Sequence, residues 1–99
     1  MDSKRFPDGI WSDIRTAVTV LRSLGAKHVY IFGSLVESAD PATARDIDIA
    51  VEGLPKKHFF PAYGRLLLAL DHQFDLVDLD SDAAFTRRLR ESGRLEQVA

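Results

Sequence analysis

With 99 residues, the chain has room for one domain with a single hydrophobic core and little room for a second substrate-binding module. Its 45% hydrophobic and 28% charged residues exclude a disordered tail, and a net charge of −2 gives no overall positive field for holding long nucleic acids nonspecifically. The absence of cysteine excludes a disulfide framework and a thiolate zinc site, and because no apolar run resembles a membrane span or a signal peptide, we expect a cytoplasmic protein.

The first predicted element is an amphipathic helix over about residues 9–25. Its apolar residues recur every three or four positions, which places them on one stripe of a helix: Ile10, Ile14, Ala17, Val18, Leu21 and Leu24. Gly25 stands where a left-handed C-terminal cap is expected. This helix should therefore pack one face against the rest of the domain.

Three strands are expected after this helix. The nearly continuous apolar run over 26–32 predicts a strand buried on both faces, so helices should cover at least one side of the sheet. Residues 46–51 predict a second strand, and the alternating apolar and acidic residues 73–79 predict a third. The end of the chain, 95–98, is a candidate for a further extended segment.

Two more helices complete the predicted fold. One should run over about 61–71, with either a kink or a short first turn because of Pro61. The other should be capped by Ser81 or Asp82 and stop at Gly93. The order of elements predicts an α/β (α+β) fold with a small mixed β-sheet and helices packed on it.

Paired aspartates on the second predicted strand are the most informative feature. Asp46 and Asp48 are two positions apart, so their side chains share one face of the strand with Cα atoms about 6.5 Å apart. Aspartate is depleted in strands, and two like charges held side by side favour a divalent cation such as Mg²⁺. Either Asp75 or Asp78 could join them from the third strand, but not both, because these two residues are an odd number apart.

A glycine and a serine follow the first predicted strand. Gly33 has no Cβ, so a phosphate can approach its backbone closely, while Ser34 offers a hydroxyl. Three carboxylates can hold two metal ions about 3.5–4 Å apart, the arrangement used in phosphoryl transfer. Taken separately, a Gly-Ser is usually a turn and an Asp-x-Asp is often a solvated strand edge. Their order on successive strands is what indicates a site.

As a set, these motifs resemble those of minimal nucleotidyltransferase (MNT) domains in the DNA polymerase β-type superfamily. The matching segments are Gly33-Ser34, Asp46-Ile47-Asp48 and Phe74-Asp75-Leu76-Val77. The resemblance extends over about residues 28–95. It implies a polymerase β-type nucleotidyltransferase fold, with a single domain over 1–99 and a catalytic core over about 27–95.

The resemblance also implies a site and a reaction. It assigns Asp46, Asp48 and Asp75 as catalytic and metal-binding residues, with two Mg²⁺ ions, and Gly33 and Ser34 as nucleotide-binding residues. Families of this kind transfer a nucleoside monophosphate, often AMP from ATP, to a hydroxyl. Stand-alone domains of this size are similar to the antitoxin halves of prokaryotic toxin–antitoxin pairs, whose partner is a helical HEPN-type toxin. The expected function is therefore Mg²⁺-dependent transfer of AMP to a partner protein of that type.

Two other hypotheses stay open. Family members commonly carry an arginine and a glycine just after the Gly-Ser, whereas residues 35–40 are apolar, small or acidic here, so the chain could be a binding module that neutralises its partner by occlusion alone. Transfer to a small molecule or an RNA end is less favoured, because the acceptor domain is missing and the net charge is negative.

The late arginines are interpreted as a solvated helix face rather than a binding patch: Arg87, Arg88, Arg90 and Arg94. Large apolar residues that could serve as a contact surface, but that helical spacing places more readily in the core, are Trp11, Phe59, Phe60 and Tyr63.

Overall fold

The computed structural model describes residues 6–37 and 46–99. The elements in chain order are α1 (Asp8–Ser23), β1 (His28–Phe32), α2 (Ser34–Glu37), β2 (Asp46–Glu52), the 3₁₀ turn η3 (Lys56–His58), α3 (Phe59–Ala69), β3 (Gln73–Asp78), α4 (Ala84–Ser92) and β4 (Glu96–Gln97). The sheet has the order β3-β2-β1-β4, with β2 and β3 parallel and the other neighbours antiparallel. The predicted mixed α+β class is therefore confirmed.

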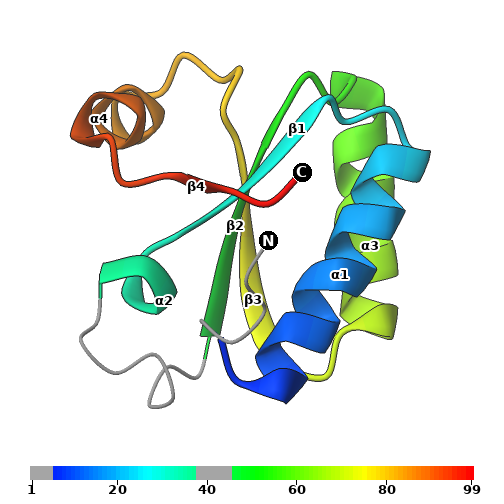
Figure 1. Cartoon of the computed structure of the whole chain (residues 1–99). Coiled ribbons are helices and arrows are strands. Elements are labelled where there is room, and N and C mark those ends of the chain that lie inside the picture. The colour runs from blue at the N-terminus through cyan, green and yellow to red at the C-terminus, as the bar shows by residue number, and fades with distance from the viewer. Residues whose placement is uncertain (1–5, 38–45) are drawn as a thin grey trace.

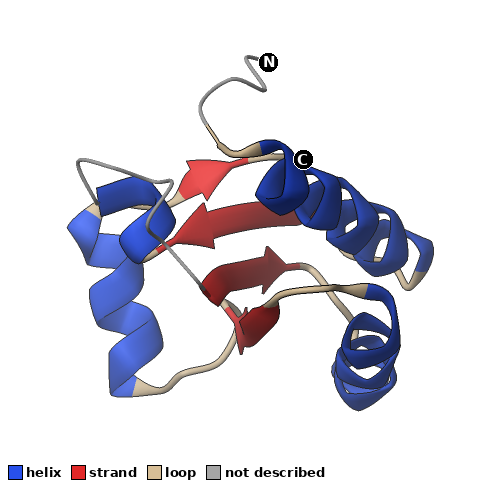
Figure 2. Cartoon of the chain, turned by 90° about the horizontal axis from the view of Figure 1, so that it is seen from below, coloured by secondary structure: helices blue, strands red, loops and turns tan. Residues whose placement is uncertain are grey.

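Helices cover both faces of this sheet. α1 and α3 pack side by side on one face, while α2 and α4 lie on the other (Figures 1 and 2). The main core lies under α1 and α3, and a smaller cluster around Phe32, Ala50 and Leu79 lies on the side of α4. In the described part of the chain, no helix combines the length and the apolar character that crossing a membrane would require.

Alternation along β2 decides which residues face which cluster. Ile47, Ile49 and Val51 are fully buried in the main core. The intervening residues therefore point to the opposite face, where Ala50 belongs to the smaller cluster and Asp48 lies two positions before it. Burial of the odd-numbered residues thus fixes the face on which the two aspartates of β2 stand.

The first helix ends as the sequence predicts. Gly25 has a positive φ of 109°, and its N–H donates to the carbonyl of Arg22 at 3.1 Å. The N–H of Ala26 donates to the carbonyl of Leu21 at 3.0 Å. This pair of bonds is a Schellman motif, which satisfies carbonyls that the helix end would leave free and turns the chain into β1.

Starts of the two later helices differ in detail from the prediction. α3 begins at Phe59 after a 3₁₀ turn, so Pro61 falls within its first turn, where the absence of an N–H leaves no helical hydrogen bond unmade. The predicted cap of α4 is wrong: Ala83 precedes the helix without a side-chain cap, and the Ser81 hydroxyl accepts from the Ala83 N–H instead. Gly93 ends α4 in the left-handed conformation, as predicted.

A buried aspartate joins α1 to the start of β3. Asp13 is only 4% exposed and accepts hydrogen bonds from the backbone N–H groups of Asp71 and His72, both at 2.9 Å. Its carboxylate also contacts the His72 Nδ1 at 2.7 Å. Because β3 begins at Gln73, this carboxylate fixes the point at which the third strand enters the sheet.

The aromatic contact candidates divide between the core and the surface. Trp11, Phe59 and Tyr63 pack against the main core, as their helical spacing indicates. Phe60 is 82% exposed on α3. Only Phe60 therefore remains a surface residue among the four.

Candidate functional site

The parallel pairing of β2 with β3 brings two predicted site residues together. Asp48 is the direct partner of Asp75, and Asp46 is the partner of Gln73. Partners on neighbouring strands point to the same face about 4.8 Å apart, so Asp75 stands beside Asp48, and Asp46 lies two residues along on that face. Asp78 points to the other face, where the Lys56 Nζ lies 3.2 Å from its carboxylate. Of the two acids of β3, only Asp75 joins the pair on β2.

The three carboxylates interact electrostatically. Burial raises the pKa of Asp48 above its ordinary value, and the negative charges of Asp75 and then Asp46 raise this pKa further. Asp46 and Asp75 are exposed, whereas Asp48 is half-buried between them. A positive charge bound on this face would relieve the repulsion between the three carboxylates.

Gly33 is fitted to the Asp48 side chain. It follows β1 with a positive φ of 74°, and a Cβ on it would overlap the Asp48 carboxylate oxygen. Both the turn and the close approach therefore require glycine at this position. The Gly-Ser and Asp-x-Asp motifs thus form one structural unit, although a long segment of chain separates them.

The segment after Gly33 is a single helical turn, α2. α2 begins at Ser34, which is exposed, and the N–H groups of Val36 and Glu37 donate to the Gly33 carbonyl at 3.0 and 2.9 Å. Leu35 is 1% exposed and anchors the turn in the core. Residues 38–45, which include Arg45, lie outside the described part of the chain.

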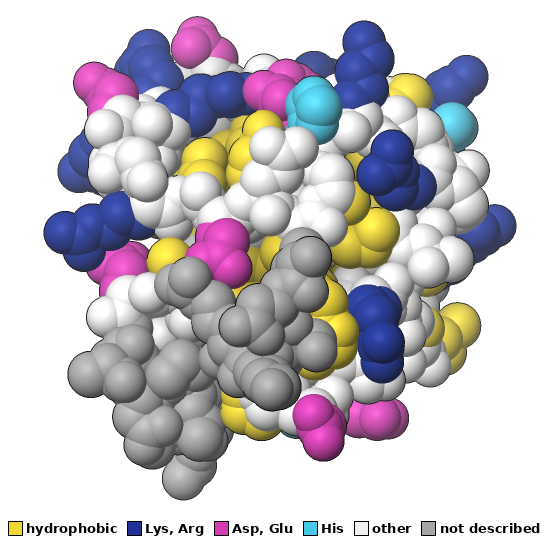
Figure 3. Space-filling model, in the orientation of Figure 1, with side chains coloured by type: hydrophobic (Ala, Val, Ile, Leu, Met, Phe, Trp, Pro, Cys, Tyr) yellow, Lys and Arg dark blue, Asp and Glu magenta, His cyan; other side chains and the backbone are white. Residues whose placement is uncertain are grey.

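The late arginines do not form one basic patch. Lysine and arginine side chains are spread around the face shown in Figure 3. Arg87 makes only a 3.5 Å contact with Asp82, and both side chains are well exposed, as expected for a solvated helix face. Arg90 instead fastens α4 to the sheet, donating to the Leu79 carbonyl and to the Glu52 carboxylate, both at 3.1 Å. Arg90 is therefore exposed, as the interpretation as a solvated face expects, but it also holds α4 to the end of the sheet.

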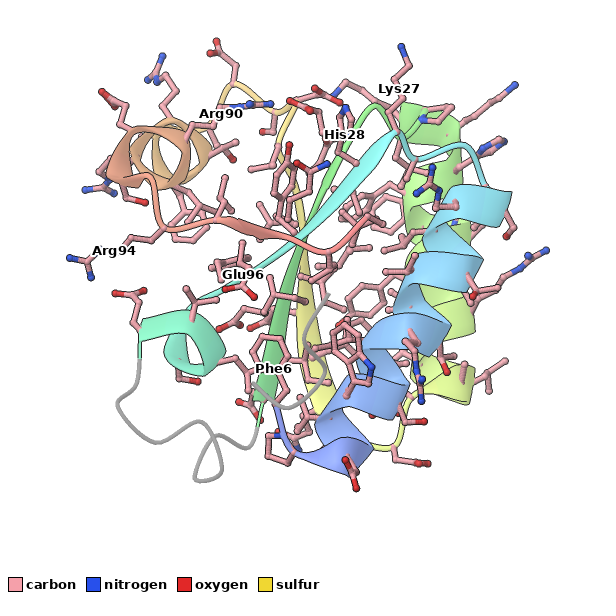
Figure 4. All side chains as sticks on the ribbon, in the orientation of Figure 1. Phe6, Lys27, His28, Arg90, Arg94 and Glu96 are labelled. Carbon is pink, nitrogen blue, oxygen red and sulfur yellow. The ribbon has the colours of Figure 1, made fainter. Side chains whose placement is uncertain are left out.

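A cavity of about 530 Å³ lies between α2 and α4. Its lining residues are Glu37, Phe85, Arg88, Leu89, Ser92 and Arg94. Arg94, in the link between α4 and β4 (Figure 4), donates to the Glu37 carboxylate at 2.6 Å and so ties this link to α2. No motif in the sequence predicts this cavity directly. The Gly93 stop and the helical spacing of Phe85, Arg88 and Leu89 were its only sequence signals.

The donor set suits Mg²⁺ in its chemistry, because carboxylate oxygens are the protein ligands that this ion prefers. As the side chains stand, residues 6–37 and 46–99 contain no group of three histidine, cysteine, aspartate or glutamate side chains close enough to hold a metal ion. Asp46 and Asp75 are exposed, so rotation of their side chains toward Asp48 is open to both. A cation would have to draw them inward.

No family model and no curated protein sequence matches the chain. Solved structures do. A crystal structure of the toxin–antitoxin complex MntA-HepT is 25% identical over 89% of this chain and 70% of that chain, with a TM-score of 0.60. A mutant of this complex is 26% identical over 87% and 71%, with a TM-score of 0.63, and a toxin–antitoxin structure with AMP-PNP is 27% identical over 89% and 71%, with a TM-score of 0.62. The chain is therefore similar to the minimal nucleotidyltransferase MntA and has its nucleotidyltransferase fold.

Proposed function

We propose that the protein is a Mg²⁺-dependent nucleotidyltransferase that moves AMP from ATP to a hydroxyl on a partner protein in the cytoplasm. The observation that carries this proposal is the juxtaposition of Asp48 and Asp75 on adjacent strands, with Asp46 on the same face and Gly33 fitted against Asp48. The similarity to MntA supports a nucleotidyltransferase-type antitoxin.

The three aspartates have distinct roles in this proposal. Asp46 and Asp48 would hold two Mg²⁺ ions, and Asp75 would complete the site. Bound there, the ions would stabilise negative charge on the triphosphate and on the leaving pyrophosphate. Asp75 stands at the exposed side of the cluster, where it can accept the proton of the acceptor hydroxyl as this oxygen attacks the α-phosphorus.

Nucleotide binding is assigned to the turn after β1. The missing side chain at Gly33 lets a phosphate approach the backbone, and the exposed hydroxyl of Ser34 can donate to a phosphate oxygen. The neighbour determined with AMP-PNP supports ATP as the donor nucleotide.

The acceptor is proposed to be a HEPN-type helical toxin. The structural neighbours are toxin–antitoxin complexes, which supports a protein partner of this kind. In this proposal the partner supplies the acceptor hydroxyl.

One observation favours the alternative, a binding module that acts by occlusion alone. Glu37 places a carboxylate near Ser34, where a triphosphate would add more negative charge. The 2.6 Å contact with Arg94 offsets that charge, which is why we favour the enzyme.

The test is transfer of label from α-³²P-ATP, with Mg²⁺, into proteins extracted from the source organism. The wild-type protein should label a band whose mass identifies the acceptor, and Asp48→Asn should not. Asp82→Asn is the matched control, because the Asp82 side chain is 96% exposed and pairs at 3.5 Å with Arg87, which is also well exposed, outside the aspartate cluster. If a partner co-purifies with the wild-type protein but takes no label, the occlusion-only module replaces the enzyme.

A further inference from the structure

We propose that the cavity between α2 and α4 binds the nucleoside of the triphosphate, with its base stacked between Phe85 and the guanidinium of Arg88. This inference rests on the proposed function and adds the part of the site that recognises the base. Neither the sequence motifs nor the aspartate cluster assigns any residue to that task.

The cavity adjoins the aspartate cluster through a short chain of contacts. Phe85 packs against Phe32, with ring centroids 6.4 Å apart. Phe32 is in turn the register partner of Asp48 across the antiparallel β1–β2 pair. Partners in such a pair have Cα atoms about 4.5–5.5 Å apart and side chains on one face. A nucleotide whose phosphates lie at Asp48 can therefore reach Phe85 with its base.

One face of α4 is directed into the cavity. Phe85, Arg88, Leu89 and Ser92 recur at spacings of three and four, which places them along a single stripe of the helix. Phe85 is nevertheless 52% exposed, and Leu89 is only partly buried. An aromatic ring that is half exposed beside an apolar neighbour suits a planar apolar ligand, and Phe and Arg are among the side chains on which bases stack.

Charge and size agree with this occupant. Two guanidinium groups, from Arg88 and Arg94, line the cavity against one carboxylate, from Glu37, in a chain whose net charge is −2. The surplus of positive charge attracts a ligand that is anionic overall, such as a nucleotide whose phosphates lie at the neighbouring Asp48. The volume of about 530 Å³ lies within the roughly 300–1,000 Å³ typical of small-molecule sites.

The contact between Glu37 and Arg94 gives the cavity its wall. It joins the end of α2 to the link that follows α4, at a distance of 2.6 Å. Glu37, in this wall, is three residues after Ser34 and belongs to the same turn, to which phosphate binding is assigned. Base and phosphates would then lie on either side of α2.

The experiment compares two probes, ATP with Mg²⁺ and inorganic tripolyphosphate with Mg²⁺, by equilibrium binding to full-length protein. Phe85→Leu keeps an apolar contact to Phe32 but removes the stacking surface, so it should weaken ATP binding about ten-fold and leave tripolyphosphate binding unchanged. Arg88→Gln should weaken ATP binding more than tripolyphosphate binding. This exposed residue lies outside both core clusters, so loss of the fold would not account for its effect.

Two variants serve as controls. Arg87→Gln changes an arginine that pairs with Asp82 and lies just before Arg88 on α4, and Phe60→Leu changes an exposed phenylalanine on α3. Both should bind ATP as the wild-type protein does. Unchanged ATP affinity in Phe85→Leu and Arg88→Gln would overturn this inference but not the proposed function. If these variants also lost label transfer while their ATP affinity stayed unchanged, the cavity would be assigned to binding of the acceptor. A wild-type protein that binds neither probe would contradict the proposed function and this inference together.

Discussion

The Asp48 carboxylate occupies the space into which a side chain on Gly33 would extend. This contact explains why a glycine at the end of β1 and an aspartate on β2 occur together. The glycine turn supports the carboxylate on one side, and the partner Asp75 stands on the other. Two consequences of this contact concern stability.

Replacing Gly33 with alanine should damage both the fold and the site. The new Cβ would meet the Asp48 carboxylate, and alanine would have to adopt a φ of 74°. We expect a loss of about 1–3 kcal/mol in the free energy of unfolding and loss of label transfer from ATP. Denaturant unfolding and the transfer assay measure the two effects.

Gly64→Ala is the matched control for this substitution. Gly64 lies inside α3, and a Cβ there would meet nothing within 4 Å. Alanine should stabilise the helix by about 0.5–1 kcal/mol without affecting transfer. A Gly33→Ala protein as stable and active as the wild type would show that Asp48 does not need the space at Gly33.

Asp48→Asn should make the metal-free protein more stable at neutral pH. The pKa of Asp48 is raised in the fold, so its protonated form is favoured there and its ionisation destabilises the native state. The wild-type protein should therefore lose stability relative to Asp48→Asn as pH rises from the ordinary carboxyl pKa of 3.8 through the raised value. Below this range the two proteins should be equally stable.

Denaturant unfolding of both proteins between pH 3 and pH 8, in the presence of a chelator, measures this difference. Asp82→Asn serves as the control and should track the wild-type protein throughout, because its carboxylate is 96% exposed. Equal stability of the wild type and Asp48→Asn at neutral pH would contradict the electrostatic interaction of the three aspartates.

Asp13→Ala should be among the most destabilising single substitutions. It removes the acceptor for two backbone N–H groups and for the His72 ring, at a carboxylate that is 4% exposed. Leaving those donors unpaired should cost about 2–3 kcal/mol in the free energy of unfolding. Asp8→Ala, an exposed acid in the first turn of the same helix, should cost less than about 1 kcal/mol. Similar losses in the two variants would show that Asp13 does not hold the start of β3.

Much of the sheet could be predicted because its strands carry strong apolar patterns. The alternation of Ile47 and Ile49 with Asp46 and Asp48 gives both the strand and its buried face. The same parity argument limits the third acid to Asp75 or Asp78, and only the register with β2 decides between them. Pairing register is a property of the assembled sheet and has no local signal in the sequence.

The parts that the sequence did not reveal depend on contacts between distant segments. α2 is a single helical turn held by the buried Leu35, too short to produce a periodic pattern. Asp13 could have been noticed as an acid on the apolar stripe of α1, but its partners are 58 and 59 residues away. Arg90 is likewise indistinguishable in sequence from Arg87, although only Arg90 bonds to the end of the sheet.

The most direct test of the central claim is the Mg²⁺ dependence of ATP binding in the wild-type protein, Asp75→Asn and Asp78→Asn. These two acids lie on the same strand and face opposite sides of the sheet: one stands beside Asp48, and the other contacts Lys56. Mg²⁺ should strengthen ATP binding to the wild type and to Asp78→Asn, and should have at most about a tenth of this effect on Asp75→Asn. A folded Asp75→Asn protein whose ATP affinity responds to Mg²⁺ as the wild type does would contradict the three-aspartate site.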